Sequence, residues 1–159
     1  LNSARPWRHQ SGGLRASRVA HLEQALERAA PGALRIAVVH HQLANPPWRT
    51  RKKPLAHRDA LVDRFAAAGV ELVLGGHVHQ ASLTCRGEFQ AEEGAGAAMV
   101  LVTAPGLGQP RPHRKGEARG LHAIDADERT LVVRSYLWRD GDWVATAERR
   151  FPRAGSAPG

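Results

Sequence analysis

Hydrophobic positions recur at helical spacing in two segments of the first half of the chain. Between Ser17 and Ala29 the apolar residues follow the roughly 3.6-residue period of an amphipathic helix, with Ser17 as the expected N-cap and Pro31 just beyond the end. Segment 57–68 repeats the pattern, and Gly69 follows at the position of a helix C-cap. Each segment therefore predicts a helix that directs one face to a core.

Two short runs of apolar residues, 34–39 and 70–74, alternate with these helices along the chain. Continuous apolar runs of this length are typical of strands that are buried on both faces, as in a sheet covered by helices. The order helix, strand, helix, strand is that of an α/β domain. The first half of the sequence therefore predicts an α/β unit.

The second half changes to segments that are typical of strands and tight turns. Asp140-Gly141 is a strong hairpin signal. The fold class that we predict is therefore α/β, with helix-flanked strands followed by a β-rich terminal region. We expect one domain over 1–151 and a frayed tail over 152–159, where proline and glycine recur. The expected strands of this half are 97–103, 121–125, 130–138 and 142–147, and 81–86 alternates only weakly.

Composition narrows the class of protein. The 159 residues carry a formal net charge of +8, but nearly all basic residues are arginines and they are scattered, which favours a GC-rich coding sequence over a nucleic-acid surface. No apolar run approaches the ~20 residues of a membrane span. Cys85 is the single cysteine, which excludes an internal disulfide. Because the chain starts at Leu1, we expect any targeting segment upstream, and the compartment stays open with a slight preference for the cytoplasm.

Histidines follow both predicted strands of the first half. His40 and His41 end the first, and the sequence GGHVH at 75–79 follows the second. Ligands collect at the carboxyl ends of strands in helix-flanked sheets, and neutral imidazole commonly binds zinc, iron and manganese. In an extended segment His77 and His79 point the same way and are expected to approach a common site. One histidine at a strand end is more often a hydrogen-bonded structural residue, but two such strands favour a metal site.

At these positions the chain resembles the calcineurin-like metallophosphoesterases. VVHH at 38–41 before a proline-containing loop, and GHVH at 76–79 after a strand, are similar to the last two metal-binding motifs of that family. The resemblance covers about residues 1–80 well and 97–150 loosely. It implies the C-terminal part of a four-layer αββα sandwich in which two metal ions (Mn, Fe or Zn) deliver a hydroxide to a phosphate ester.

The resemblance also implies roles for individual histidines. His40 and His77 match ligands of the second metal ion of the family, and His79 matches a ligand of the first. His41 and Gly76 would then lie beside the ligands without binding an ion. We therefore expect His40, His77 and His79 to be the metal ligands.

The loop between the two histidine-bearing strands is basic and contains prolines. Arg49 and Arg51 lie in this loop, and we expect them to contact the phosphate of a phosphate-ester substrate. The resemblance by itself does not identify that substrate.

The family's earlier motifs are absent from this sequence. No aspartate precedes Asp59, so the bridging carboxylate and the other ligands of those motifs are not in this chain. We therefore interpret the chain as the C-terminal half of a phosphodiesterase or phosphomonoesterase that is inactive alone. The alternatives are a non-catalytic protein-interaction scaffold of the same fold and, supported by charge alone, a nucleic-acid-acting nuclease module. The oligomeric state is not determined by the sequence.

Overall fold

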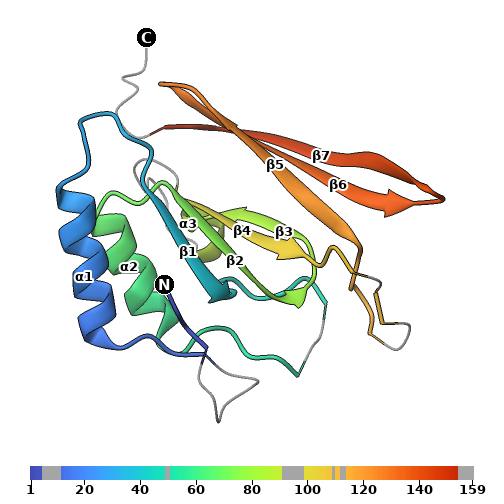
Figure 1. Cartoon of the computed structure of the whole chain (residues 1–159), viewed down its shortest axis with the longest axis horizontal. Coiled ribbons are helices and arrows are strands. Elements are labelled where there is room, and N and C mark those ends of the chain that lie inside the picture. Colours follow the sequence, from blue (N-terminus) through green and yellow to red (C-terminus); the bar gives the residue numbers. More distant parts are fainter. Residues whose placement is uncertain (5–11, 49–50, 91–98, 109, 112–113, 154–159) are drawn as a thin grey trace.

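The structure is a computed structural model that describes residues 1–4, 12–48, 51–90, 99–108, 110–111 and 114–153. These residues form a mixed α/β arrangement of helices and two sheets (Figure 1). None of the described helices is both long and apolar enough to cross a membrane. In chain order the elements are α1 (Ala16–Glu27), β1 (Ile36–His41), α2 (Arg58–Ala67), β2 (Leu72–His79), β3 (Ser82–Cys85), α3 (Arg86–Gln90), β4 (Val100–Pro105), β5 (Gly120–Ala126), β6 (Thr130–Arg139) and β7 (Asp142–Pro152).

The first sheet has the strand order β1-β2-β4-β3. β1, β2 and β4 run parallel, so their carboxyl ends meet at one edge, while β3 lies antiparallel beside β4. β5, β6 and β7 form a separate antiparallel sheet. Asp140 and Gly141, with φ values of 51° and 90°, make the tight turn between β6 and β7. The hairpin predicted at this dipeptide is therefore confirmed.

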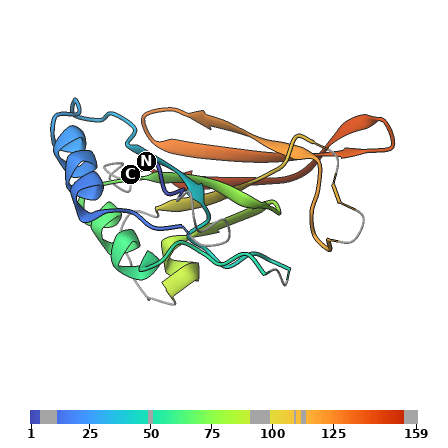
Figure 2. The ribbon, with the colours of Figure 1, turned by 60° about the horizontal axis from the view of Figure 1, so that its bottom comes forward.

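The helices and the second sheet lie on opposite faces of the four-stranded sheet (Figures 1 and 2). In the larger core, between α1, α2 and the sheet, Val62 and Phe65 of α2 are fully buried. The described residues thus form three layers, and the four-layer sandwich stays a prediction. A smaller core lies between the two sheets and contains Leu72, Val100, Val102, Leu131, Val133 and Phe151.

Some element boundaries differ from those that the sequence predicts. α1 begins at Ala16, its N-cap Arg15 makes no side-chain capping bond, and Ser17 is exposed inside the first turn. The N-cap prediction for Ser17 is therefore wrong. β1 and β2 extend beyond their apolar runs, because parallel pairing continues to His41 opposite Gly76. The histidines consequently lie within the strand ends rather than after them.

The ordered chain continues past residue 152, where the sequence predicts the start of a frayed tail. Arg153 is buried, and its guanidinium donates to both carboxylate oxygens of Glu71 at 3.1 and 3.0 Å. It also donates to the carbonyl oxygens of Gly32 and Asp127. Arg153 therefore ties the end of β7 to the start of β2, and residues 154–159 lie outside the described part.

Candidate metal centre

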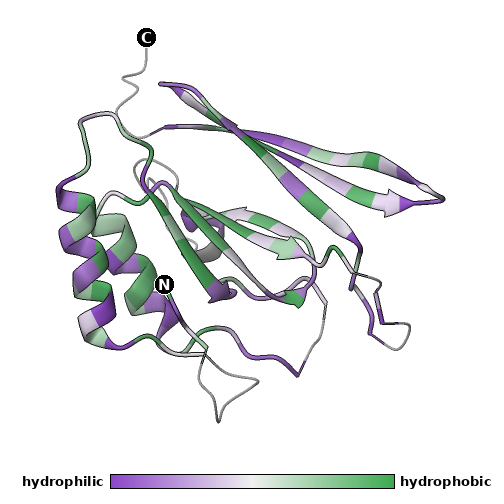
Figure 3. Ribbon diagram, viewed as in Figure 1, coloured by the Kyte–Doolittle hydropathy of each residue, from purple (hydrophilic) through white to green (hydrophobic). Residues whose placement is uncertain are grey.

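The carboxyl ends of β1 and β2 carry the histidines of the candidate site. β2 begins with the buried residues Leu72 and Val73, whereas β1 alternates between exposed and buried positions. The tip of β1 is hydrophilic (Figure 3). His40 and His41 are the last two residues of that strand. The two strands are parallel neighbours, with His41 opposite Gly76. Residues that are distant in sequence are therefore brought to the same edge of the sheet.

Gly75 allows the ends of β1 and β2 to come close together. A Cβ atom at Gly75 would lie 3.3 Å from the Cα atom of Gln42 and 3.4 Å from the carbonyl oxygen of His41. At Gly76 a Cβ atom would have more room, with the carbonyl oxygen of His40 at 3.7 Å. Gly75, rather than Gly76, thus serves the close backbone approach that the sequence pattern indicates.

Three imidazole rings meet at this edge. One ring nitrogen from each of His40, His41 and His77 lies within 4.8 Å of the others. The ring centroids are 4.9 Å apart for His40 and His41, 5.0 Å for His40 and His77, and 4.4 Å for His41 and His77. Nε2 of His40 and Nδ1 of His77 share a hydrogen bond of 3.1 Å. We call these three residues the histidine cluster.

Ser3 and Gly12 hold the ring of His41 in place. The hydroxyl oxygen of Ser3, which is fully buried, lies 2.9 Å from Nδ1 of His41 and accepts the backbone N–H of His41 at 3.2 Å. A Cβ atom at Gly12 would lie 2.3 Å from Nδ1 of His41. Only a residue without a side chain therefore fits against this ring. With Nδ1 engaged by Ser3, Nε2 is the nitrogen of His41 left for a ligand.

His79 lies outside the histidine cluster. Val78 is buried between His77 and His79, but both histidines have positive φ values, 72° and 59°. The strand is therefore not regularly extended there, and the i, i+2 alternation does not bring the two rings together. The ring of His79 instead lies near Gly106, where a Cβ atom would be 3.6 Å away. Ligation by His40, His77 and His79 remains a prediction from the sequence.

Burial and nearby positive charge favour the neutral form of His41 and His77. Burial lowers the pKa of His77 to about 4, and the charges of Lys52 and of neighbouring histidines act in the same direction. Burial, followed by the charges of His40 and Lys52, also lowers the pKa of His41. Imidazole binds metal ions in its neutral form. His41 and His77 are therefore in the state that ligation needs near pH 7.

The donor set fits one transition-metal ion. Nε2 of His77 is buried without a hydrogen-bond partner among the described residues, as expected for an atom that has a ligand to bind. Three imidazoles suit zinc, iron and related ions. Within the described residues no carboxylate belongs to this group. The bridging carboxylate of a two-ion centre is therefore not supplied by the cluster.

Lys52 is the residue of the basic loop that reaches the strand ends. Its Nζ atom donates to the carbonyl oxygen of His77. Arg51 is exposed on the same loop, and Arg49 lies outside the described residues. The substrate contacts predicted for these two arginines thus remain predictions. The sequence pattern does not predict the contacts of Lys52, Ser3 and Gly12 with the histidines, because each of these contacts joins residues that are 25 or more positions apart.

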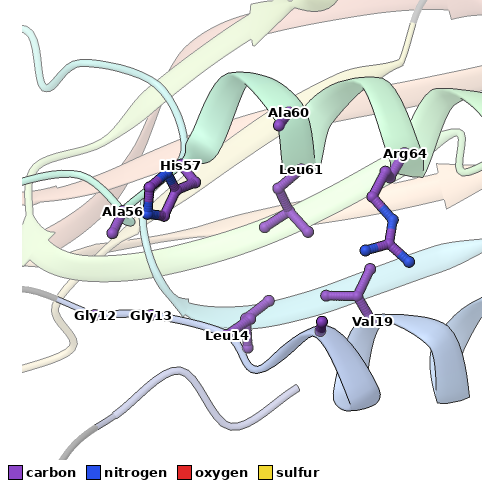
Figure 4. A pocket seen from close by; sticks show the side chains of 10 residues that line it. Gly12, Gly13, Leu14, Val19, Ala56, His57, Ala60, Leu61 and Arg64 are labelled. Atoms are coloured by element: carbon purple, nitrogen blue, oxygen red, sulfur yellow. The ribbon is translucent and has the colours of Figure 1, made fainter.

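A separate cavity of about 300 Å³ lies between the N-terminal ends of α1 and α2 (Figure 4). Val19 and Leu61 belong to its apolar wall, and His57 and Arg64 lie at its border. Arg64 is held by hydrogen bonds of 2.6 and 2.8 Å to Glu23. This cavity is therefore mainly apolar and distinct in chemistry from the histidine cluster.

Solved structures of Vps29 from Entamoeba histolytica are similar to this chain. The wild-type protein complexed with Zn²⁺ shares 17% identity over 78% of this chain and 58% of its own, with a TM-score of 0.46. A single mutant of Vps29 shares 17% identity over 75% of this chain and 55% of its own, with a TM-score of 0.44. A double mutant of Vps29 shares 11% identity over 89% of this chain and 91% of its own, with a TM-score of 0.41. No family model and no curated protein matches the chain.

The chain spans 55% and 58% of the length of two of these Vps29 structures. Vps29 has the calcineurin-like metallophosphoesterase fold. A likeness at these identities and TM-scores assigns no ligand, partner or activity to this chain. The metallophosphoesterase interpretation accordingly rests on the motifs of the sequence.

Proposed function

We propose that this chain binds a divalent transition-metal ion through His40, His41 and His77, as the imidazole-bearing part of a phosphoesterase-type metal centre. The observation that carries this proposal is the convergence of three ring nitrogens within 4.8 Å at the carboxyl edge of a parallel sheet. The buried, unpartnered Nε2 atom of His77 supports it further. A bound ion would supply Lewis-acid polarisation of a phosphoryl oxygen.

The residues around the cluster would orient the rings toward such an ion. Ser3 engages Nδ1 of His41 and so directs Nε2 of that ring toward a ligand. Lys52 binds the backbone of His77 and places a positive charge beside the site. A phosphate ester, which is anionic, would be attracted to that charge.

Hydrolysis by two ions requires a bridging ligand, usually a carboxylate, in addition to imidazoles. Because the described cluster contains none, we expect the chain alone to bind metal without turning over phosphate esters. Titration calorimetry with Zn²⁺ and Mn²⁺ on metal-free protein tests the first part, with about one ion bound per chain as the expected result. Hydrolysis of bis(p-nitrophenyl) phosphate tests the second, and turnover that depends on His77 would contradict it.

His40→Ala and His77→Ala are the informative variants for metal binding, and His21→Ala is their matched control. His21 is an exposed histidine on α1, away from the strand ends. We expect the first two to lose about 100-fold or more in Zn²⁺ affinity and the control to stay unchanged. Equal affinity in all four proteins would show that the ion binds elsewhere.

An exposed apolar edge supports a second candidate function, that of a protein-interaction scaffold. Among the described strands β1 lies at the edge of its sheet, and on one face of it Ile36 and Val38 are 40% and 56% exposed. Parallel sheets are normally covered on both faces, so an apolar edge of this kind suits a protein partner. A photo-crosslinking residue at Val38 tests this function in cells, with Arg28 on the exposed surface after α1 as the control position. We expect one discrete crosslinked protein from position 38 and none from position 28. The same crosslinked products from both positions would reject the scaffold function.

A further inference from the structure

A second cavity, of about 440 Å³, lies at the C-terminal ends of α1 and α2, which run side by side (Figures 1 and 2). Leu26 and Glu27 of α1 and Ala67 of α2 line it, together with Arg35 and Gly69 from the segments that lead into β1 and β2. Small-molecule sites in proteins have volumes of about 300–1,000 Å³. This cavity is therefore large enough for a small organic ligand.

The cavity lies at the opposite end of the first sheet from the histidine cluster. Arg35 directly precedes β1, whereas His40 and His41 are the last residues of that strand. At about 3.3 Å per residue, the six residues of β1 place roughly 20 Å between the two ends. The cavity and the histidine cluster share no residue. A ligand in this cavity would therefore be independent of the proposed metal centre.

An ion pair between the two helices forms one border of the cavity. Arg64 reaches from α2 toward α1 (Figure 4) and donates to both carboxylate oxygens of Glu23 at 2.8 and 2.6 Å. The hydrogen bond from Arg64 lowers the pKa of Glu23, so this carboxyl group is ionised near pH 7. The charges of Arg64 and Glu23 thus offset each other at this border.

Arg35 supplies a guanidinium group that has an incomplete set of hydrogen bonds. Its Nε atom is buried and has no hydrogen-bond partner among the described residues. At Gly69, where φ is 72°, a Cβ atom would lie 2.6 Å from Nη1 of Arg35, so the glycine makes room for the guanidinium. A buried donor without an acceptor costs free energy, which an anion bound beside it would recover. Arg35 is therefore the group of this cavity that is suited to an anionic ligand.

We propose that this cavity binds a small molecule that carries one carboxylate group, and that Arg35 donates hydrogen bonds to that carboxylate. The planar guanidinium matches a carboxylate through parallel N–H donors. The buried side chain of Leu26 and the methyl group of Ala67 offer apolar surface to the body of the ligand. Because Glu23 and Glu27 also line the cavity, a singly charged carboxylate suits it better than a doubly charged phosphate does.

Titration calorimetry of the metal-free chain with 4-methylpentanoate tests this site, and the uncharged 4-methylpentanamide is the matched ligand. Arg35→Gln is the main variant, and Arg139→Gln, at an exposed arginine at the end of β6, is the control. We expect Arg35→Gln to lose about tenfold or more in affinity for the carboxylate and the control to stay unchanged. The amide should bind the unsubstituted chain as weakly as the carboxylate binds Arg35→Gln. Equal affinities of the three proteins, or of the two ligands, would overturn the proposal.

Ala67→Leu tests the cavity without altering Arg35. Ala67 is exposed, and leucine is a good helix former, so the fold should be retained while the larger side chain fills part of the cavity. We expect about a tenfold loss of 4-methylpentanoate affinity, and an unchanged affinity would show that the ligand binds elsewhere. Thermal unfolding without ligand verifies that both variants are folded.

Two further titrations identify the ligand class and separate this site from the proposed function. Inorganic phosphate should bind more weakly than 4-methylpentanoate, and equal or tighter binding that depends on Arg35 would overturn the assignment to a carboxylate. The affinity for 4-methylpentanoate should be the same with and without Zn²⁺ and in His77→Ala. Binding that needs His77 would place the ligand at the histidine cluster and overturn this site, whereas failure of Zn²⁺ to bind would reject the metal centre alone.

Discussion

Nε2 of His40 lies 3.1 Å from Nδ1 of His77, although 37 residues separate the two histidines. Parallel pairing of β1 with β2 produces this contact, because it sets the carboxyl ends of the two strands side by side. His41 completes the group and is held by Ser3 from the N-terminal segment. The candidate site is thus assembled from three separate parts of the chain.

His41→Gln and His79→Gln distinguish the observed cluster from the family pattern. In the cluster His41 is a ligand and His79 is not, so we expect Zn²⁺ affinity to fall about 10–100-fold in the first variant and about twofold or less in the second. Calorimetric titration measures both affinities. Thermal unfolding of the metal-free variants controls for loss of fold, and a larger effect at His79 would favour the family assignment of ligands.

Ser3→Ala tests the support of His41. The substitution removes a fully buried hydroxyl that contacts both the ring and the backbone N–H of His41. We expect the free energy of unfolding to fall by about 1–3 kcal/mol. Ser17→Ala, at an exposed position without a capping bond, should change it by less than about 0.5 kcal/mol. Urea unfolding measures the two changes, and similar values would show that Ser3 does not support the ring.

Arg153→Met tests the buried ion pair between β7 and β2. The variant leaves the buried carboxylate of Glu71 without its guanidinium partner, which costs about 3–5 kcal/mol in comparable buried pairs. Arg150→Met removes an exposed arginine of the same strand, with 65% of its side chain accessible, and should cost less than about 0.5 kcal/mol. Denaturant unfolding compares the two. A small effect at Arg153 would mean that the pair adds no net stability.

The low pKa of Glu88 predicts that acid lowers the free energy of unfolding. Hydrogen bonds from Arg149 and from the backbone of Cys85 lower the pKa of Glu88 from 4.5 to about 2. A carboxylate with a depressed folded-state pKa stabilises the fold above its unfolded pKa, and this stability is lost as the pH falls from about 4.5 toward 2. Glu88→Gln should therefore flatten the fall in unfolding free energy across this window. Unfolding curves at pH 5, 4, 3 and 2 measure it, and an unchanged slope would contradict the assignment.

Local signals in the sequence predicted most of the fold. The apolar runs before His40 and His77 correctly indicate strands. The expected burial on both faces is wrong for β1, because Ile36 and Val38 on one of its faces are 40% and 56% exposed. The Asp140-Gly141 turn follows from the backbone freedom of those two residues. β3 and α3 are too short for such signals: β3 lies in the weakly alternating segment, and α3 has five residues. Their positions depend on pairing with β4 and on contact with α2.

The sequence by itself determined that histidines stand at two strand ends and that no early aspartate accompanies them. Only the tertiary structure decided which rings meet. Positive φ values at His77 and His79 break the alternation of side chains and send the ring of His79 toward Gly106. The ring of His41 completes the cluster, because Gly12 leaves room for this ring and Ser3 hydrogen-bonds to it. Ring directions follow from backbone torsions and distant packing, which a local pattern of residues does not encode.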